Sequence, residues 1–96
     1  MTITSSSSNV TVSGNTVTAS GGATALAVQV NNSSATVTGN SLSASGGTTN
    51  NDTVLLFTAN ILSGSSGNTA VAGSCSVTGA GTGSTVTFTN AAACGP

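Results

Sequence analysis

The chain has 96 residues and a single charged side chain at neutral pH, Asp52, because it contains no Lys, Arg, His or Glu. Nucleic-acid binding is excluded, since phosphate contacts need several basic side chains and base stacking needs aromatic rings, and the only aromatic residues are two Phe. No apolar run approaches the roughly 20 residues of a membrane-spanning helix, so we expect no membrane insertion.

Residues 1–8 come first among the predicted elements. Thr2-Ile3-Thr4 is β-prone and leads into four serines, so we expect an N-terminal strand or arm here, which either adds to another copy or stays flexible. Residues 9–96 are expected to form a single β domain. Ser and Gly richness is also typical of disorder, but the positive mean hydropathy of +0.32 and the near-absence of charge favour a folded chain.

An internal repeat organises this domain. Residues 11–22 recur 25 positions later as residues 36–47, a third copy is read at 56–65 and a weaker fourth copy at 76–80. The copies align apolar residues in columns two positions apart, with polar columns between them, which is the alternation of half-buried strands. The apolar columns are Val10, Ala35, Leu55 and Cys75, and Val12, Val37, Phe57 and Val77.

Asparagine occupies the corner after the first strand of the first three copies, at Asn15, Asn40 and Asn60, and the fourth copy has Ala80 there. Asn tolerates the left-handed conformation of a sharp bend, and stacked amides can hydrogen-bond from one rung to the next. We therefore predict an Asn ladder.

The same dipeptide, Gly-Asn, also indicates a tight β-hairpin, which would give an antiparallel β-sandwich built of hairpins. A type II′ hairpin needs Gly at a position where the third copy has Ala59. For this reason we favour an all-β fold that is a small β-solenoid, a parallel β-helix of about four rungs.

Polar residues flank the apolar columns and predict a regular hydroxyl face. Rungs stacked about 4.8 Å apart would present it as a flat array, which suits a crystalline polysaccharide or ice. The candidate array residues are Thr11, Ser13, Thr36, Thr38, Thr58, Ser76 and Thr78.

Cys75 and Cys94 are the only cysteines and lie 19 positions apart. A disulfide between them would constrain the unfolded chain by about 3 kcal/mol, and it would indicate an oxidising, extracellular or cell-surface location. The alternative is two buried thiols, which behave as small apolar side chains.

Two sets of residues resemble a known group of proteins. Val-x-Gly-Asn-x-Val followed by Gly-Gly resembles the repeat of right-handed parallel β-helix proteins, which include pectate-lyase-like proteins, phage tailspikes and autotransporter passenger domains. Phe57-Thr58-Ala59-Asn60 and Gly21-Gly22-Ala23 are similar to the FxxN and GGA repeats of polymorphic outer-membrane autotransporters. The resemblance implies a scaffold with an extracellular address, and it implies no activity.

The residues needed for catalysis are missing. Asp52 alone supplies neither an acid and base pair nor a calcium site, the serines have no His or Lys to activate one, and two cysteines do not make a zinc site. We therefore expect no enzyme and no cofactor, and we assign Asp52 to a polar turn.

Self-association is the function we favour. A solenoid exposes unpaired strand edges at its ends, and this chain lacks the charged residues that normally protect such edges. We expect a homo-oligomer or polymer, such as a subunit of a surface fibre, filament or stalk. The alternatives are a fragment of an adhesin passenger, or a glycan-binding or ice-binding array.

Overall fold

The computed structural model describes residues 1–3 and 9–96, and this part of the chain is all-β without any helix. Its strands, in chain order, are β1 (Thr2–Ile3), β2 (Val10–Ser13), β3 (Thr16–Ser20), β4 (Thr24–Asn31), β5 (Ser34–Thr38), β6 (Ser41–Ser45), β7 (Asn50–Phe57), β8 (Asn60–Ile61), β9 (Thr69–Ala72) and β10 (Ser74–Val77).

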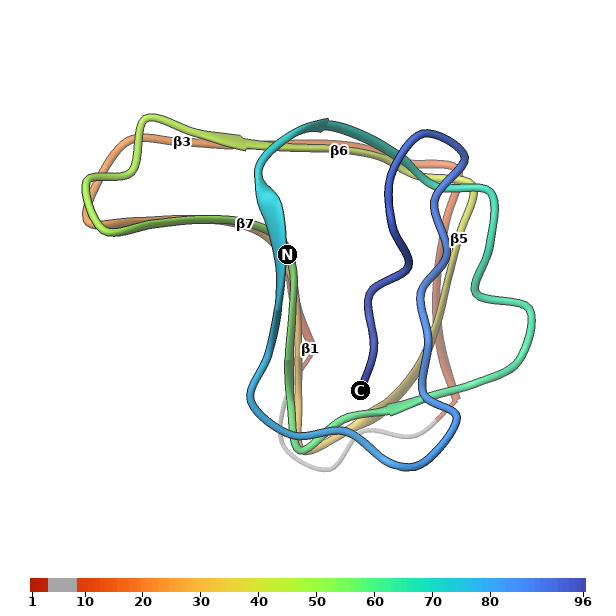
Figure 1. Ribbon diagram of the computed structural model, residues 1–96. Helices are drawn as coiled ribbons and strands as arrows, with labels where there is room; N and C mark the ends of the chain where they lie inside the picture. Colours follow the sequence, from red (N-terminus) through yellow and green to blue (C-terminus); the bar gives the residue numbers. More distant parts are fainter. Residues whose placement is uncertain (4–8) are drawn as a thin grey trace.

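The strands stack into three sheets around a common axis, so the chain winds as a small β-solenoid (Figure 1). The sheets have the orders β1-β4-β7-β10, β2-β5-β8 and β3-β6-β9. Neighbouring strands in all three sheets run parallel, which rules out the sandwich of antiparallel hairpins. We number the coils by their strands: coil one is β2 to β4, coil two is β5 to β7, and coil three is β8 to β10.

The first two strands of coils one and two follow the 25-residue repeat residue for residue. Val10 lies beside Ala35 and Val12 beside Val37 in the pair β2 and β5, and the pair β3 and β6 keeps the same spacing over all five positions. Val12 and Val37 are buried, and so are Leu42 and Ala44 on β6. The predicted alternation is therefore confirmed for these two coils.

Coil three differs from the prediction. Ile61, rather than Leu55, lies beside Ala35, while Leu55 and Phe57 belong to β7 and lie beside Gln29 and Asn31 of β4. The columns that placed Leu55 and Phe57 with β5 were thus wrong. The reason is that β7 is eight residues long, so coil two ends later than a shift of 20 residues allows.

The number of stacked strands agrees with the predicted figure of about four rungs, since the first sheet has four strands and the other two have three each. After β10 the described chain forms isolated bridges, such as Asn68 to Phe88, instead of a fourth set of strands. The solenoid therefore has three strand-forming coils, followed by an irregular segment that runs across the end of the stack (blue in Figure 1).

The long strands β4 and β7 bend in the middle. Ala27 and Val28 are neighbours and both fully buried, because the chain turns a corner between them and both side chains point inward. The first halves of β4 and β7 lie along β3 and β6 and form an arm at the left of Figure 1, which coil three lacks. At its tip Gly47 is tightly packed, since a Cβ there would lie 2.8 Å from the backbone nitrogen of Ala25.

Left-handed residues turn the corners between sheets. The corner before β2, β5 and β8 has Asn9, Asn32 and Thr58, with φ of 57°, 49° and 50°. The corner before β3, β6 and β9 has a glycine with positive φ, namely Gly14, Gly39 and Gly67. Each of these glycines precedes an asparagine, so the same Gly-Asn bend recurs in all three coils.

The N-terminal residues pair within their own chain. Thr2 and Ile3 lie in parallel beside Gln29 and Val30 of β4, Ile3 is buried in the core, and the Met1 ammonium donates to the carbonyl of Ala27 at 2.7 Å. The described part of the predicted arm is thus a strand of the same molecule, and residues 4–8 of that arm lie outside the described residues.

Candidate functional site

A ladder of asparagine amides lines the corner between the second and third sheets. The backbone nitrogen and Nδ2 of Asn15 both donate to Oδ1 of Asn40, at 3.0 and 3.3 Å. Asn40 repeats this toward Oδ1 of Asn68, at 3.0 and 3.1 Å. Each rung therefore gives two donors to one acceptor in the following rung.

The second amide hydrogen of each inner asparagine points back to the preceding coil. Nδ2 of Asn40 donates to the carbonyl of Val12 and Nδ2 of Asn68 to that of Val37, both at 2.9 Å. Asn40 is 1% exposed and Asn68 is fully buried. Because both amides use all their donors, burying them carries little desolvation penalty.

The third member of the ladder is Asn68, and the prediction of Asn60 was wrong. Asn60 begins β8 and is exposed, and its side-chain amide donates to Ser34 Oγ at 3.4 Å instead of to another asparagine. The error follows from the shift of 20 residues, which aligned Ala59-Asn60 with the Gly-Asn corners. The signal that identifies Asn68 is the dipeptide Gly67-Asn68, since Gly-Asn occurs in the chain only at the three ladder corners.

The seven hydroxyl residues predicted as one array lie in three places. Thr11 and Ser13 on β2 lie beside Thr36 and Thr38 on β5 and form a patch of two rungs. The other three are elsewhere: Thr58 turns a corner, Ser76 is on β10 beside Leu55, and Thr78 follows β10.

A longer row of hydroxyls lies on the neighbouring sheet. Thr16, Thr18 and Ser20 of β3 lie beside Ser41, Ser43 and Ser45 of β6, and they alternate with side chains that point inward. The sequence contains this alternation as Thr-Val-Thr-Ala-Ser and Ser-Leu-Ser-Ala-Ser, but the prediction followed the strand before the corner instead.

The end of the stack at β2 and β3 has no further strand on it among the described residues. Gly21 donates to Ser45, and Asn15 accepts from Ser41, so the backbone groups of the odd-numbered residues of β3 face β6. Because these groups alternate along a strand, the N–H and C=O of Thr16 and Thr18 face outward. We call the outer edges of β2 and β3, together with Asn15, the N-terminal end.

Residues 84–94, which we call the C-terminal cap, cover the opposite end. Val86 and Cys94 are fully buried, pair with each other in antiparallel fashion, and belong to the core. Phe88 packs against the same core and lies in parallel beside Asn68. The two ends of the solenoid are thus different: the cap closes one, whereas at the other β1 covers only the second half of β4 and no described strand covers β2 or β3.

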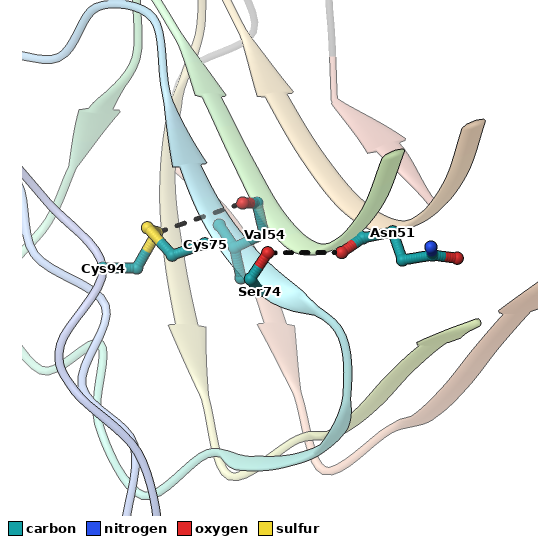
Figure 2. The surroundings of a disulfide bond; sticks show 5 residues. All are labelled: Asn51, Val54, Ser74, Cys75 and Cys94. Atoms are coloured by element: carbon teal, nitrogen blue, oxygen red, sulfur yellow. Dashed lines mark hydrogen bonds between the residues drawn. A yellow bond between two sulfur atoms is a disulfide. The ribbon is translucent and has the colours of Figure 1, made fainter. Parts of the chain in front are cut away.

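A disulfide joins Cys75 on β10 to Cys94 in the C-terminal cap, as predicted. Figure 2 shows the bridge at the edge of β10, with the Cys94 sulfur directed toward the carbonyl of Val54, 4.0 Å away. Ser74, the neighbour of Cys75, donates to the carbonyl of Asn51 at 3.5 Å. A disulfide is compatible with an oxidising, extracellular environment.

Asp52 lies in β7 and not in a turn, so that assignment was wrong. It is 8% exposed and lies between Leu26 of β4 and Ser74 of β10. It has no ion pair with another side chain, because the chain contains no basic side chain. Its position in the register of the first sheet makes it part of the strand stack.

No family model, curated protein or solved structure matches the chain. Within residues 1–3 and 9–96 there is no helix able to cross a membrane. The ladder, the hydroxyl row and the two unlike ends are therefore the features from which a function is inferred.

Proposed function

We propose that this chain is a non-catalytic structural protein of the extracellular space or cell surface, which associates with copies of itself as a subunit of a fibre, filament or stalk. The observation that carries the proposal is the outer edge of β3, which no described strand covers and where the backbone groups of Thr16 and Thr18 face away from β6. Such an edge is a template for pairing with another strand.

The lack of charge strengthens this proposal. Natural sheet edges are usually protected by Lys, Pro or inward-pointing charge, whereas β3 carries only Thr, Val, Ala and Ser. A formal charge of −1 on 96 residues also gives neighbouring copies almost no mutual repulsion. Pairing through β3 therefore meets no electrostatic barrier.

The residue content supports a role without catalysis. The single acid, Asp52, lies in the strand stack with no basic side chain to work with, and the two cysteines are joined to each other. General acid and base work and nucleophilic catalysis both need partners that this chain does not contain.

Sedimentation velocity and electron microscopy of the purified chain test the proposal, in the bridged and in the reduced form. Thr18→Pro removes an N–H that faces outward, and proline is tolerated at such edge positions, so the fold should persist while pairing is lost. Thr18→Val keeps the N–H and serves as the matched control. We expect assemblies in at least one form, abolished by Thr18→Pro and retained by Thr18→Val; a monomer in both forms would refute the function.

A second candidate function is binding to ice or to a crystalline polysaccharide. It is favoured by the register that places Thr16, Thr18 and Ser20 beside Ser41, Ser43 and Ser45. We expect Ser43→Lys to interrupt this row and lower thermal hysteresis or retention on cellulose and chitin, while Thr78→Lys, on an exposed position outside the row, leaves both unchanged. The absence of either activity in the unmodified chain dismisses this candidate.

A further inference from the structure

We infer that the C-terminal cap occupies the place of a next coil, and that opening the Cys75–Cys94 bridge frees this place for the N-terminal end of a second copy. The cap would then decide whether copies can add head to tail. This inference rests on the proposed self-association and specifies which surfaces meet.

Two hydrogen-bond patterns join each coil to the next at the ladder. In the first, an asparagine gives its N–H and its Nδ2 to one Oδ1 of the following coil, as Asn40 does to Asn68. In the second, the residue after the following asparagine donates back to the asparagine carbonyl: Ser41 to Asn15 at 2.8 Å, and Thr69 to Asn40 at 2.7 Å.

The cap reproduces both patterns with other groups. The backbone nitrogen and Nδ2 of Asn68 both donate to the carbonyl of Thr87, at 3.4 and 3.1 Å, so this carbonyl takes the place of a fourth asparagine Oδ1. Thr89 then donates to the carbonyl of Asn68 at 2.8 Å, as Thr69 does to Asn40. The cap is therefore a substitute for a coil.

A side-chain amide completes the substitution at β9. The nitrogen of Ala70 donates to Oδ1 of Asn90 at 2.9 Å, and Nδ2 of Asn90 donates to the carbonyl of Ala70 at 2.8 Å. The exposed side chain of Asn90 thus binds both outward-facing backbone groups of Ala70, which a neighbouring strand would otherwise bind.

The N-terminal end carries the groups that the cap imitates. Oδ1 of Asn15 holds the position at which Asn40 and Asn68 accept two donors each, and no donor from the described residues reaches it. The N–H of Thr16 faces outward and is equivalent to those of Ser41 and Thr69. A second copy that sets its β2 and β3 on β8 and β9 of the first would give Asn15 Oδ1 to Asn68 and the Thr16 N–H to the Asn68 carbonyl. This stacking requires β1 of the second copy to leave the edge of β4, which β10 of the first copy then takes.

The bridge is the covalent tie that keeps the cap in this place. The cap buries few side chains, chiefly Val86 and Cys94, whereas its residues 89–93 are exposed. A dithiol such as dithiothreitol opens the bridge by thiol–disulfide exchange: it transfers two electrons and two protons, leaves thiols on Cys75 and Cys94, and becomes a disulfide itself.

Cys75→Ser is the direct test, because Cys75 is exposed and its replacement leaves the buried Cys94 unaltered. We expect the bridged chain to sediment at one small size. The Cys75→Ser chain, and the unmodified chain in dithiothreitol, should form particles many times larger at the same concentration. Thr18→Pro in the Cys75→Ser background should remove these particles, and Thr18→Val should retain them.

Hydrogen exchange shows whether the fold persists in each sample. The amides of Thr87 and Thr89 should lose protection in unassembled, reduced chains while those of β4 and β7 keep it. Large particles from the bridged chain in equal amount would overturn the cap inference and leave self-association standing. Reduced chains that keep the amides of β4 protected and stay small overturn the cap inference. Reduced, unassembled chains in which the amides of Thr87 and Thr89 remain protected overturn it as well. A chain that is small in both the bridged and the reduced form also overturns the proposed function.

Discussion

Replacing each ladder asparagine by alanine should give a steep order of stability losses. The side chain of Asn40 takes part in four hydrogen bonds, two accepted from Asn15 and two donated to Val12 and Asn68. At about 1 kcal/mol for each bond, Asn40→Ala should lower the free energy of unfolding by about 4 kcal/mol. The Asn68 side chain also makes four such bonds, so Asn68→Ala should cost a similar amount.

The outer asparagines should cost much less. Asn15 donates two side-chain bonds from a half-buried position where water can replace them, so Asn15→Ala should cost about 1 kcal/mol. Asn60 makes one exposed bond of 3.4 Å, so Asn60→Ala should cost less than about 0.5 kcal/mol. Asn15→Ala and Asn60→Ala are matched controls, since they delete the same side chain.

Thermal and urea unfolding of the bridged protein measure this order. For a domain of this size 1 kcal/mol corresponds to at least about 4 °C in Tm, so Asn40→Ala and Asn68→Ala should lower Tm by about 16 °C or more. Equal losses for Asn60→Ala and Asn68→Ala would show that the ladder continues through Asn60, and would refute the energetic argument drawn from the buried amides.

Three further predictions concern single sites. Reduction of the Cys75–Cys94 bridge should lower the free energy of unfolding by about 3 kcal/mol under conditions where the chain is monomeric, because the bridge closes a loop between cysteines 19 positions apart. A loss below about 1 kcal/mol in urea unfolding would contradict this. Thr58→Asn should raise stability by about 1 kcal/mol, since Thr58 is β-branched at φ 50°, whereas Thr36→Asn within β5 should give no gain. Leu42→Ala should cost about 2 to 5 kcal/mol because Leu42 is fully buried, against a change near zero for Val71→Ala at 63% exposure.

The part of the fold that could be predicted is the part where strands alternate and end at a fixed corner. The pairs Val12 with Val37 and Thr16 with Ser41 follow directly from the 25-residue repeat, because a period of two residues defines which side chains face inward. Coils one and two therefore predict the inward and outward faces of their strands, whereas the choice of a solenoid over hairpins depends on the third copy.

Strand β4 and its neighbour β7 were not predictable in the same way. Their bend places Ala27 and Val28 side by side in the core, so the alternation breaks where the chain turns. Leu26 and Gln29, on either side of the bend, lie beside Asp52 and Leu55, and only the three-dimensional path makes them equivalent.

Coil three shows why a correct fold can be reached through a wrong alignment. The repeat predicts Ala59 at the corner of the third copy, and a corner without glycine favours a solenoid over hairpins; the actual corner residue is Gly67. Two features cause the discrepancy: β7 is eight residues long, and a longer loop follows β8, where residues 62–67 separate Ile61 from Asn68 and Ser65 donates to the carbonyl of Leu62. Loops of this kind change coil length without changing the inward columns.

The Asn ladder gives the stack a chemical direction. Every rung passes two donors toward the C-terminal end, and Asn40 and Asn68 each receive two at Oδ1. The last rung therefore needs an acceptor, and the first rung, Asn15, offers one. A carbonyl meets the first need, as Thr87 does for Asn68, but a carbonyl has no N–H to pass onward and therefore stops the ladder. Asn15 differs, because its Oδ1 is an acceptor at the N-terminal end while its Nδ2 already donates to Ser13 and Asn40. Copies that join through the ladder, as we propose, can consequently add in one orientation only, and we expect the cap, which the disulfide holds in place, to prevent this addition.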